Sequence, residues 1–276
     1  MIKLLKIELK KIINYRVFWI LTGLYFFFLA SGILMSEFIL NNWVDNFNKH
    51  LPIPLPHVTL YFFPDIWQNM LFFASIRYFL IFPAIIIIIL ITNEFTFRTI
   101  RQNLINGLSR KEFIIAKLQI IFWLSLIITV ILALVIFVLG AIHTDQLNIS
   151  IITRKIIFIP GFFIQILSFL LFAFFFGFLF RNTGLSLALF TLYALIIEPV
   201  MYYVLKIPFF QPNSISSWLP VNSVLKVVEY PSIPFLQKFT GLHLQTGISL
   251  LDCSIPLIYS VLMIAIVFWI MLRRDV

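Results

Sequence analysis

The chain contains six apolar runs, each of a length that can cross a lipid bilayer as a helix. A crossing needs roughly 20 predominantly apolar residues, because the hydrocarbon core of the bilayer is about 30 Å thick. The sequence therefore predicts an all-α membrane protein whose 276 residues form one transmembrane domain. The predicted spans are about 17–35, 73–92, 119–142, 157–180, 185–204 and 254–272.

The amino-acid composition excludes an ordinary water-soluble surface. Hydrophobic residues make up 62% of the chain and charged residues only 11%, whereas soluble domains carry about 25% charged residues. In a soluble protein the net charge of +9 would suggest nucleic-acid binding. Here the basic residues lie beside apolar spans, so we expect contact with anionic membrane lipid and no nucleic-acid partner.

The sequence predicts no metal site, no cofactor and no enzymatic activity. The single cysteine, Cys253, excludes an intrachain disulfide and a thiolate cluster, and the four histidines lack the spacing of metal ligands. None of the nine glycines directly precedes a lysine, so the chain lacks the G-x-x-x-x-G-K-[ST] phosphate loop. Any ATP hydrolysis would therefore belong to a separate subunit.

Residues 2–16 predict an amphipathic helix before the first span. Apolar residues recur at helical spacing from Ile2 to Ile13, and three lysines and an asparagine follow a neighbouring stripe. A basic helix of this kind suits the headgroup region of a membrane, so we expect an interfacial helix. A cleaved signal peptide is the alternative, but the next apolar run is too long for its hydrophobic region.

Lysine and arginine are distributed unevenly between the two sides of the predicted spans. Thirteen of the 20 lie on the side that holds both chain ends, and seven lie on the other side, which has the longer loops. Because positive residues accumulate in cytoplasmic loops, we expect both termini in the cytoplasm. The loops at about 36–72 and 205–252 would then be extracytoplasmic.

The polar segment 93–118 joins the second and third spans. The sequence predicts that the second span continues as a helix to about Asn103 and that the chain turns at Asn106–Gly107. Ser109 and Glu112 fit a capping box, which predicts that the next helix starts directly after Ser109.

An apolar stripe is predicted along this segment, because Phe97, Ile100, Leu104 and Leu108 recur at helical spacing. We expect such an apolar stripe to be buried against another surface and not exposed to water. It either packs against the N-terminal helix or docks on a cytoplasmic partner protein, and the sequence leaves both interpretations open.

Charged and turn residues follow one another along the same segment in a recognisable order. Asn93-Glu94-Phe95 stands at the membrane edge, followed by Arg98, by Gly107-Leu108-Ser109-Arg110 and by Lys117 at the third span. This pattern resembles the cytoplasmic loop of ABC type-2 transporter permeases. That family also has a basic interfacial helix at its N-terminus, six spans and a large extracytoplasmic excursion before the last span.

The resemblance implies a permease subunit of an ATP-driven exporter in a bacterial plasma membrane. Two permeases, identical or different, would form the pathway, and each would dock on a cytoplasmic ATP-binding-cassette ATPase subunit. An ion-coupled secondary transporter and a non-transporting membrane scaffold are the alternatives. The residues expected at the ATPase contact are Glu94, Arg98, Arg101, Gly107, Ser109, Arg110 and Lys111.

Glu198 is an ionisable residue within the fifth predicted span, directly before Pro199. Proline lacks a backbone N–H, so it frees the carbonyl of Leu195 four residues earlier. Intramembrane carboxylates are costly and often functional. Glu198 is either a carboxylate that is hydrogen-bonded to its neighbours near the interface, or a substrate contact or gate in the pathway.

Overall fold

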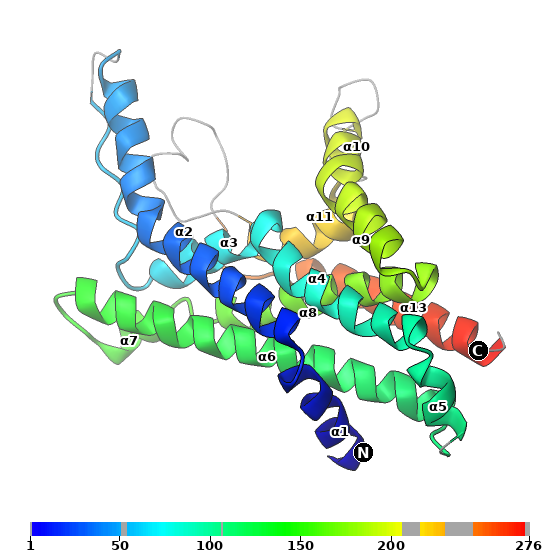
Figure 1. The fold of residues 1–276 in the computed structure, drawn as a ribbon. Coiled ribbons are helices and arrows are strands. Elements are labelled where there is room, and N and C mark those ends of the chain that lie inside the picture. Colours follow the sequence, from blue (N-terminus) through cyan, green and yellow to red (C-terminus); the bar gives the residue numbers. More distant parts are fainter. Residues whose placement is uncertain (1, 51–53, 106, 206–215, 230–244, 274–276) are drawn as a thin grey trace.

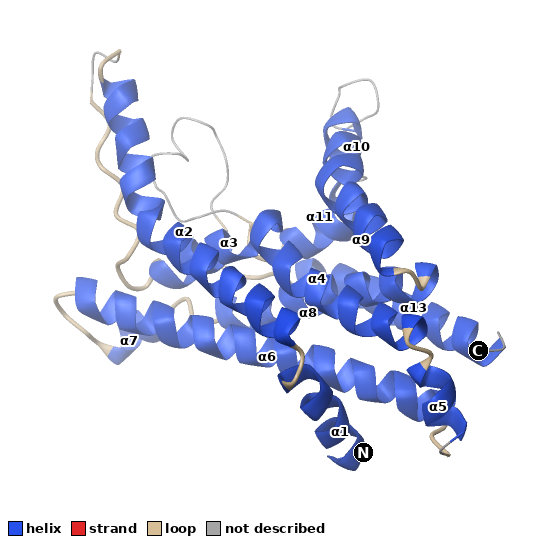
Figure 2. Ribbon diagram, in the orientation of Figure 1, coloured by secondary structure: helices blue, strands red, loops and turns tan. Residues whose placement is uncertain are grey.

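The computed structural model describes residues 2–50, 54–105, 107–205, 216–229 and 245–273. These ranges contain helices, turns and loops but no strand (Figure 2). Within them, six helical stretches are long and apolar enough to cross a membrane, so the predicted helical architecture with six candidate spans is confirmed. The six stretches are Arg16–Asn48, Arg77–Thr96, Arg110–His143, Ile149–Phe180, Thr183–Leu205 and Leu250–Arg273.

The central helix of the bundle is α8 (Phe158–Phe180). It packs against α4 (Arg77–Thr96), α6 (Arg110–His143) and α13 (Leu250–Arg273) (Figure 1). Its buried face is rich in phenylalanine, so aromatic rings fill the space between these helices. The fully buried aromatic side chains of α8 include Phe158, Phe162, Phe169 and Phe174.

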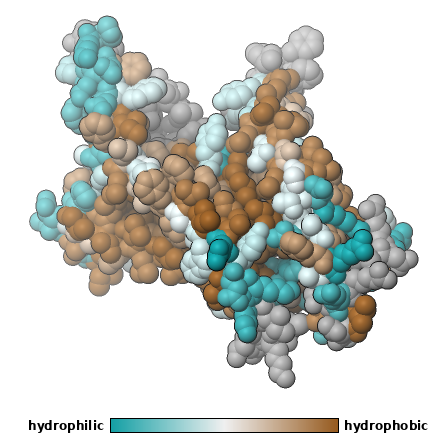
Figure 3. Space-filling model, viewed as in Figure 1, coloured by the Kyte–Doolittle hydropathy of each residue, from teal (hydrophilic) through white to brown (hydrophobic). Residues whose placement is uncertain are grey.

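The outer helices of the bundle expose apolar side chains, as helices that contact lipid do. These helices are α2 (Arg16–Asn48) and the fifth span, which consists of α9 (Thr183–Leu192), a π-helical turn (Tyr193–Ile197) and α10 (Glu198–Leu205). Figure 3 shows hydrophobic surface across the middle of the molecule. Hydrophilic surface gathers at the far end of α2 and beside α1 (Ile2–Ile13).

The prediction of a loop over residues 36–72 is wrong at both ends of this range, where the chain is helical. Helix α2 continues to Asn48, and α3 occupies Ile66–Ser75. The extension of α2 is held by the returning chain, because the Asn41 side chain accepts from the N–H of Val58 at 2.7 Å and donates to its carbonyl at 3.1 Å. These bonds pair residues that are 17 positions apart, which a local sequence pattern does not reveal.

The second predicted loop, 205–252, lies partly outside the described residues. Its described part contains a 3₁₀ turn (Ser216–Trp218) and the short helix α11 (Pro220–Leu225). The last span begins at Leu250. Another short helix, α7 (Ile149–Thr153), precedes α8.

Segment 93–118 also differs from its prediction at one point. Helix α4 ends at Thr96, Arg98 has a left-handed φ of 53°, and the short helix α5 (Thr99–Ile105) follows. The continuous helix predicted to Asn103 is therefore interrupted at Arg98. A left-handed residue reverses the chain locally, so α5 leaves the axis of α4 (Figure 1).

Candidate functional site: a buried charge cluster at the base of segment 93–118

Four charged side chains from three helices meet at the end of the bundle that carries α1 and α5. Lys117 Nζ of α6 lies 2.5 Å from Glu8 Oε2 of α1 and 2.7 Å from Glu94 Oε1 of α4. Lys11 Nζ of α1 lies 3.0 Å from Glu8 Oε1 and 3.0 Å from Glu94 Oε1. We call these four residues the charge cluster. It fastens α1 to the end of α4 and to the first turns of α6.

The charge cluster is electrically balanced, and three of its four residues are buried, whereas the Lys11 side chain is 40% exposed. Lys117 is 3% exposed, and Glu8 and Glu94 are each 6% exposed. Two carboxylates and two ammonium groups compensate one another, which is the condition for keeping charges out of water. Burial disfavours the charge on Lys11, but the hydrogen bond and the negative charge of Glu8, together with Glu94, outweigh burial and raise the pKa of Lys11.

The charge cluster also reaches the first residue of α5. The Thr99 hydroxyl donates a hydrogen bond to the Glu94 carboxylate, across the break at Arg98. Next to Glu94, the Asn93 amide donates to the Tyr15 hydroxyl at 3.2 Å, in the turn between α1 and α2. Segment 93–118 is therefore bonded at its base to the whole N-terminal part of the chain.

The turn between α5 and α6 is set by two residues that the sequence singled out. Gly107 has a φ of 92°, a conformation that L side chains rarely adopt. The Ser109 N–H donates to Glu112 Oε2 at 2.8 Å, and the Glu112 N–H donates to Ser109 Oγ at 3.2 Å. This capping box and the start of α6 at Arg110 are confirmed.

The basic residues of the segment do not share one environment. Arg98 and Lys111 are exposed. Arg110 instead donates to the carbonyls of Met271 at 3.0 Å and Leu272 at 3.3 Å, near the end of α13. Cations are favourable at this end of a helix, so Arg110 joins α6 to α13. Arg101 lies on α5, and its side chain is outside the described part of the structure.

The predicted apolar stripe is not a single exposed face. Phe97 is 68% exposed, whereas Ile100 is 1% exposed and packs into the core. Leu108 is half-buried, and the side chain of Leu104 lies outside the described part of the chain. The break at Arg98 changes the helical register between Phe97 and Ile100, so spacing along one helix no longer applies.

Glu198 lies in a different place, toward the end of the bundle away from α5. Its side chain is fully buried, and its carboxylate accepts from the N–H of Val221 at 3.0 Å and from the N–H of Asn222 at 2.5 Å. The structure therefore does not bring Glu198 together with the residues of segment 93–118. It surrounds the carboxylate with hydrogen-bond donors.

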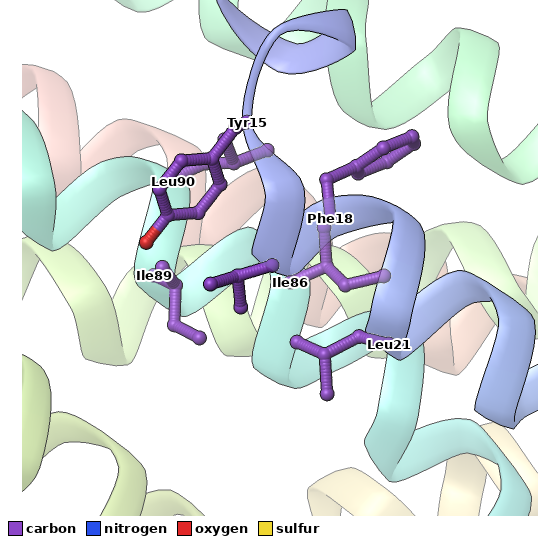
Figure 4. Close-up of a pocket in the computed structure, with 7 residues that line it drawn as sticks. Tyr15, Phe18, Leu21, Ile86, Ile89 and Leu90 are labelled. Carbon is purple, nitrogen blue, oxygen red and sulfur yellow. The ribbon is translucent and has the colours of Figure 1, made fainter.

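A shallow apolar recess, too narrow to enclose a water molecule, lies between the start of α2 and α4 (Figure 4). Its one polar lining group, the Tyr15 hydroxyl, is already used by Asn93. Ligand sites need polar groups that fix orientation, so this recess offers no recognition chemistry. The lining residues are Tyr15, Val17, Phe18, Leu21, Ile86, Ile89 and Leu90.

Sequence reasoning missed Glu8 and Lys11 and treated Lys117 only as part of a resemblance. Two signals were available. Glu8 is the single acidic residue in the basic stretch 2–16, and Lys117 stands within an apolar run. A lone charge on an otherwise uniform helix needs a partner, but the sequence does not say which one.

No three histidine, cysteine, aspartate or glutamate side chains in the described ranges are grouped so that they could hold a metal ion. The contacts within the charge cluster are ion pairs, and they join α1 to α4 and to α6. The scan against protein-family models gives no match, and the search of curated proteins finds no relative of this chain.

Proposed function

We propose that the chain is the membrane-spanning subunit of an ATP-driven exporter, similar to ABC type-2 permeases, and that segment 93–118 couples it to a separate ATPase subunit. The observation that carries the proposal is the charge cluster. Glu94 stands at the start of the segment and Lys117 at its end, and they bond to each other and to α1. Packed side chains and salt-bridge networks of this kind can carry coupling between distant sites, which supports the proposal.

The side chains of α1 support an interfacial position for this helix, which the proposal assigns to the cytoplasmic face. Glu8 and Ile12 are buried against the bundle, whereas Leu9 and Ile13 are 38% and 56% exposed. Trp19, at the start of α2, is 56% exposed and donates its indole N–H to the Ile13 carbonyl at 2.8 Å. Exposed tryptophan is typical of the membrane interface.

The proposed ATPase contact consists of the exposed part of the segment. Arg98 and Lys111 present positive charge, and Phe97 presents an exposed aromatic ring. Gly107 and Ser109 give the turn its shape, and Glu94 anchors it. Arg110 belongs to the scaffold in this proposal, because it binds the last carbonyls of α13. A second permease, the same or different, completes the transporter.

The test is co-purification of an ATPase from native membranes. The tagged chain is solubilised after mild cross-linking, and bound proteins are identified by sequence. We expect a protein with a phosphate loop, and ATP hydrolysis by the purified complex. The double substitution Arg98→Glu and Lys111→Glu reverses two exposed charges, so it should remove the ATPase while the chain still inserts.

The matched control is Lys49→Glu, which reverses an exposed lysine beyond the end of α2 away from segment 93–118. This variant should retain the ATPase. If the double variant keeps its ATPase as fully as the control does, segment 93–118 is not the contact. If no ATPase accompanies the unmodified chain, the scaffold or the ion-coupled transporter replaces this proposal.

A further inference from the structure

Residues 216–229 form a short strap at the end of the bundle opposite α5. The strap contains a 3₁₀ turn (Ser216–Trp218) and α11, and it lies beside α8 and α13 (Figure 1). Its apolar side chains face inward and belong to the core of the bundle. These buried residues are Val221, Val224, Val227 and Val228.

The first turn of α11, within the strap, is fastened by Glu198 of the fifth span. Helix α11 has Leu219 at its N-cap, a residue whose side chain cannot accept a hydrogen bond, so its first N–H groups need another acceptor. The Glu198 carboxylate accepts from Val221 and Asn222 and is also hydrogen-bonded by the Tyr193 hydroxyl. The Glu198 side chain, more than 20 residues upstream, therefore caps the N-terminus of α11.

Arg77, the first residue of α4, completes the fastening. In the π-helical turn the Glu198 N–H donates to the Tyr193 carbonyl, and Pro199 has no N–H, so the Ala194 carbonyl lacks a donor from its own helix. Arg77 Nη1 donates to that carbonyl at 2.9 Å. Its other terminal nitrogen donates to the Asn222 side chain. The strap, the fifth span and α4 are therefore joined at one point.

The last residues of the strap are fastened separately, by Gln245. Its side-chain oxygen accepts from the N–H of Glu229 at 3.0 Å, and its side-chain nitrogen donates to the Val227 carbonyl at 3.0 Å. The Gln245 carbonyl in turn accepts from the Gln68 side chain of α3 at 2.9 Å. Polar bonds thus fasten the start of α11 and the last residues of the strap, and the buried valines pack against the bundle between them.

We propose that residues 216–229 are a releasable closure of this end of the bundle, and that Glu198 is the positioning residue that keeps the strap shut. The fastening depends on a few hydrogen bonds to the buried Glu198 carboxylate, and hydrogen bonds to a charged group contribute only about 1.5–3 kcal/mol each, so the loss of this one side chain is expected to release the strap. That the strap opens during export rests on the proposed function. That Glu198 holds it shut does not.

The test measures the accessibility of one buried strap residue in the chain without an ATPase partner. Val224, which is 4% exposed, is replaced by cysteine after the native cysteine is removed by Cys253→Ser. A maleimide is then applied to the chain purified in detergent, where the reagent reaches both ends of the bundle. We expect no labelling of this parent. Adding Glu198→Gln, which removes the negative charge and one acceptor oxygen, should accelerate labelling about 10- to 100-fold.

The matched control is Glu37→Gln. Glu37 also accepts a backbone N–H, from Leu60 at 3.2 Å, but it lies on α2 and not on the strap. This control should leave Val224→Cys unlabelled. Asn222→Ala is a milder second variant, because it removes the acceptor of Arg77 and keeps both N–H donors to Glu198. It should accelerate labelling by less than Glu198→Gln does.

Labelling of the parent as fast as an exposed cysteine would show that the strap is not closed, and would overturn the proposal. Equal, negligible labelling of the parent and of every strap variant that elutes as a folded species would also overturn it. If Glu198→Gln does not fold, the proposal is tested by comparing the labelling rates of the parent and of Asn222→Ala. Loss of the ATPase partner changes none of these readings, so the two proposals fail independently.

Discussion

The ammonium of Lys117 lies 2.7 Å from a carboxylate oxygen of Glu94, although 23 residues separate them along the chain. These two residues enclose almost all of segment 93–118. Their ion pair therefore closes the segment at its base and leaves the turn at Gly107 to project. Glu8 binds the same ammonium, so the N-terminal helix shares the fastening.

Removing the central ammonium by Lys117→Met should destabilise the protein strongly. Glu8 and Glu94 would then remain buried beside a single cation, Lys11, and breaking a buried ion pair in this way costs about 3–5 kcal/mol. Thermal unfolding in detergent would show a large fall in the midpoint. The control Lys111→Met alters an exposed lysine of the same helix and should change little. Equal midpoints for the two variants would contradict the role of the charge cluster.

Glu8→Gln should loosen α1 without unfolding the bundle, because Lys117 keeps its bond to Glu94. The reporter is Ile12→Cys in a chain that carries Cys253→Ser, since Ile12 is only 5% exposed. Maleimide labelling of purified protein should become faster in the Glu8→Gln background. Asp45→Asn, which alters a surface pair with His57, should leave the labelling rate unchanged. Unchanged labelling in Glu8→Gln would mean that apolar packing alone holds α1.

Gly107→Ala should destabilise the turn of segment 93–118 by about 1–2 kcal/mol, because a Cβ atom disfavours the positive φ at this position. Gly23 is the matched control. It lies within α2, and no neighbouring atom comes within 4 Å of the place that an added Cβ would occupy, so Gly23→Ala should be neutral or stabilising. Urea or thermal unfolding compares the two variants. A loss of stability in Gly23→Ala equal to that in Gly107→Ala would contradict the strain argument.

The proposed orientation predicts that Lys111 and His57 lie on opposite sides of the membrane. In chains carrying Cys253→Ser, His57→Cys should react with an impermeant maleimide in intact cells. Lys111→Cys should react only after permeabilisation. Both native side chains are exposed, so accessibility is not limited by burial. The reverse pattern would place segment 93–118 outside the cell, where no cytoplasmic ATPase could reach it.

Local sequence patterns predicted the features that depend on neighbouring residues. Apolar runs located the six spans, and the spacing of Ser109 and Glu112 located the start of α6. The break at Arg98 was missed because arginine carries no signal for a left-handed φ. Helical spacing predicted that α4 continues to Asn103, and this prediction is wrong because the helix breaks at Arg98.

The charge cluster and the strap could not be predicted, because their bonds join residues far apart in the sequence. Glu8 and Lys117 are 109 positions apart, and Arg77 and Asn222 are 145 positions apart. The sequence correctly predicted that Pro199 leaves a backbone carbonyl without a donor from its own helix, but it named the wrong residue. The π-helical turn shifts the unpaired acceptor from Leu195 to Ala194, where Arg77 reaches it.

Helix α4 carries a member of each polar assembly, Arg77 as its first residue and Glu94 two residues before its end. At 1.5 Å per residue these two positions are about 26 Å apart along a single helical rod. A displacement of α4 along its axis would therefore pull on the N-terminal helix at one membrane face and on Asn222 at the other face in the same stroke. One helix could thus synchronise events on the two sides of the bilayer without any intervening relay.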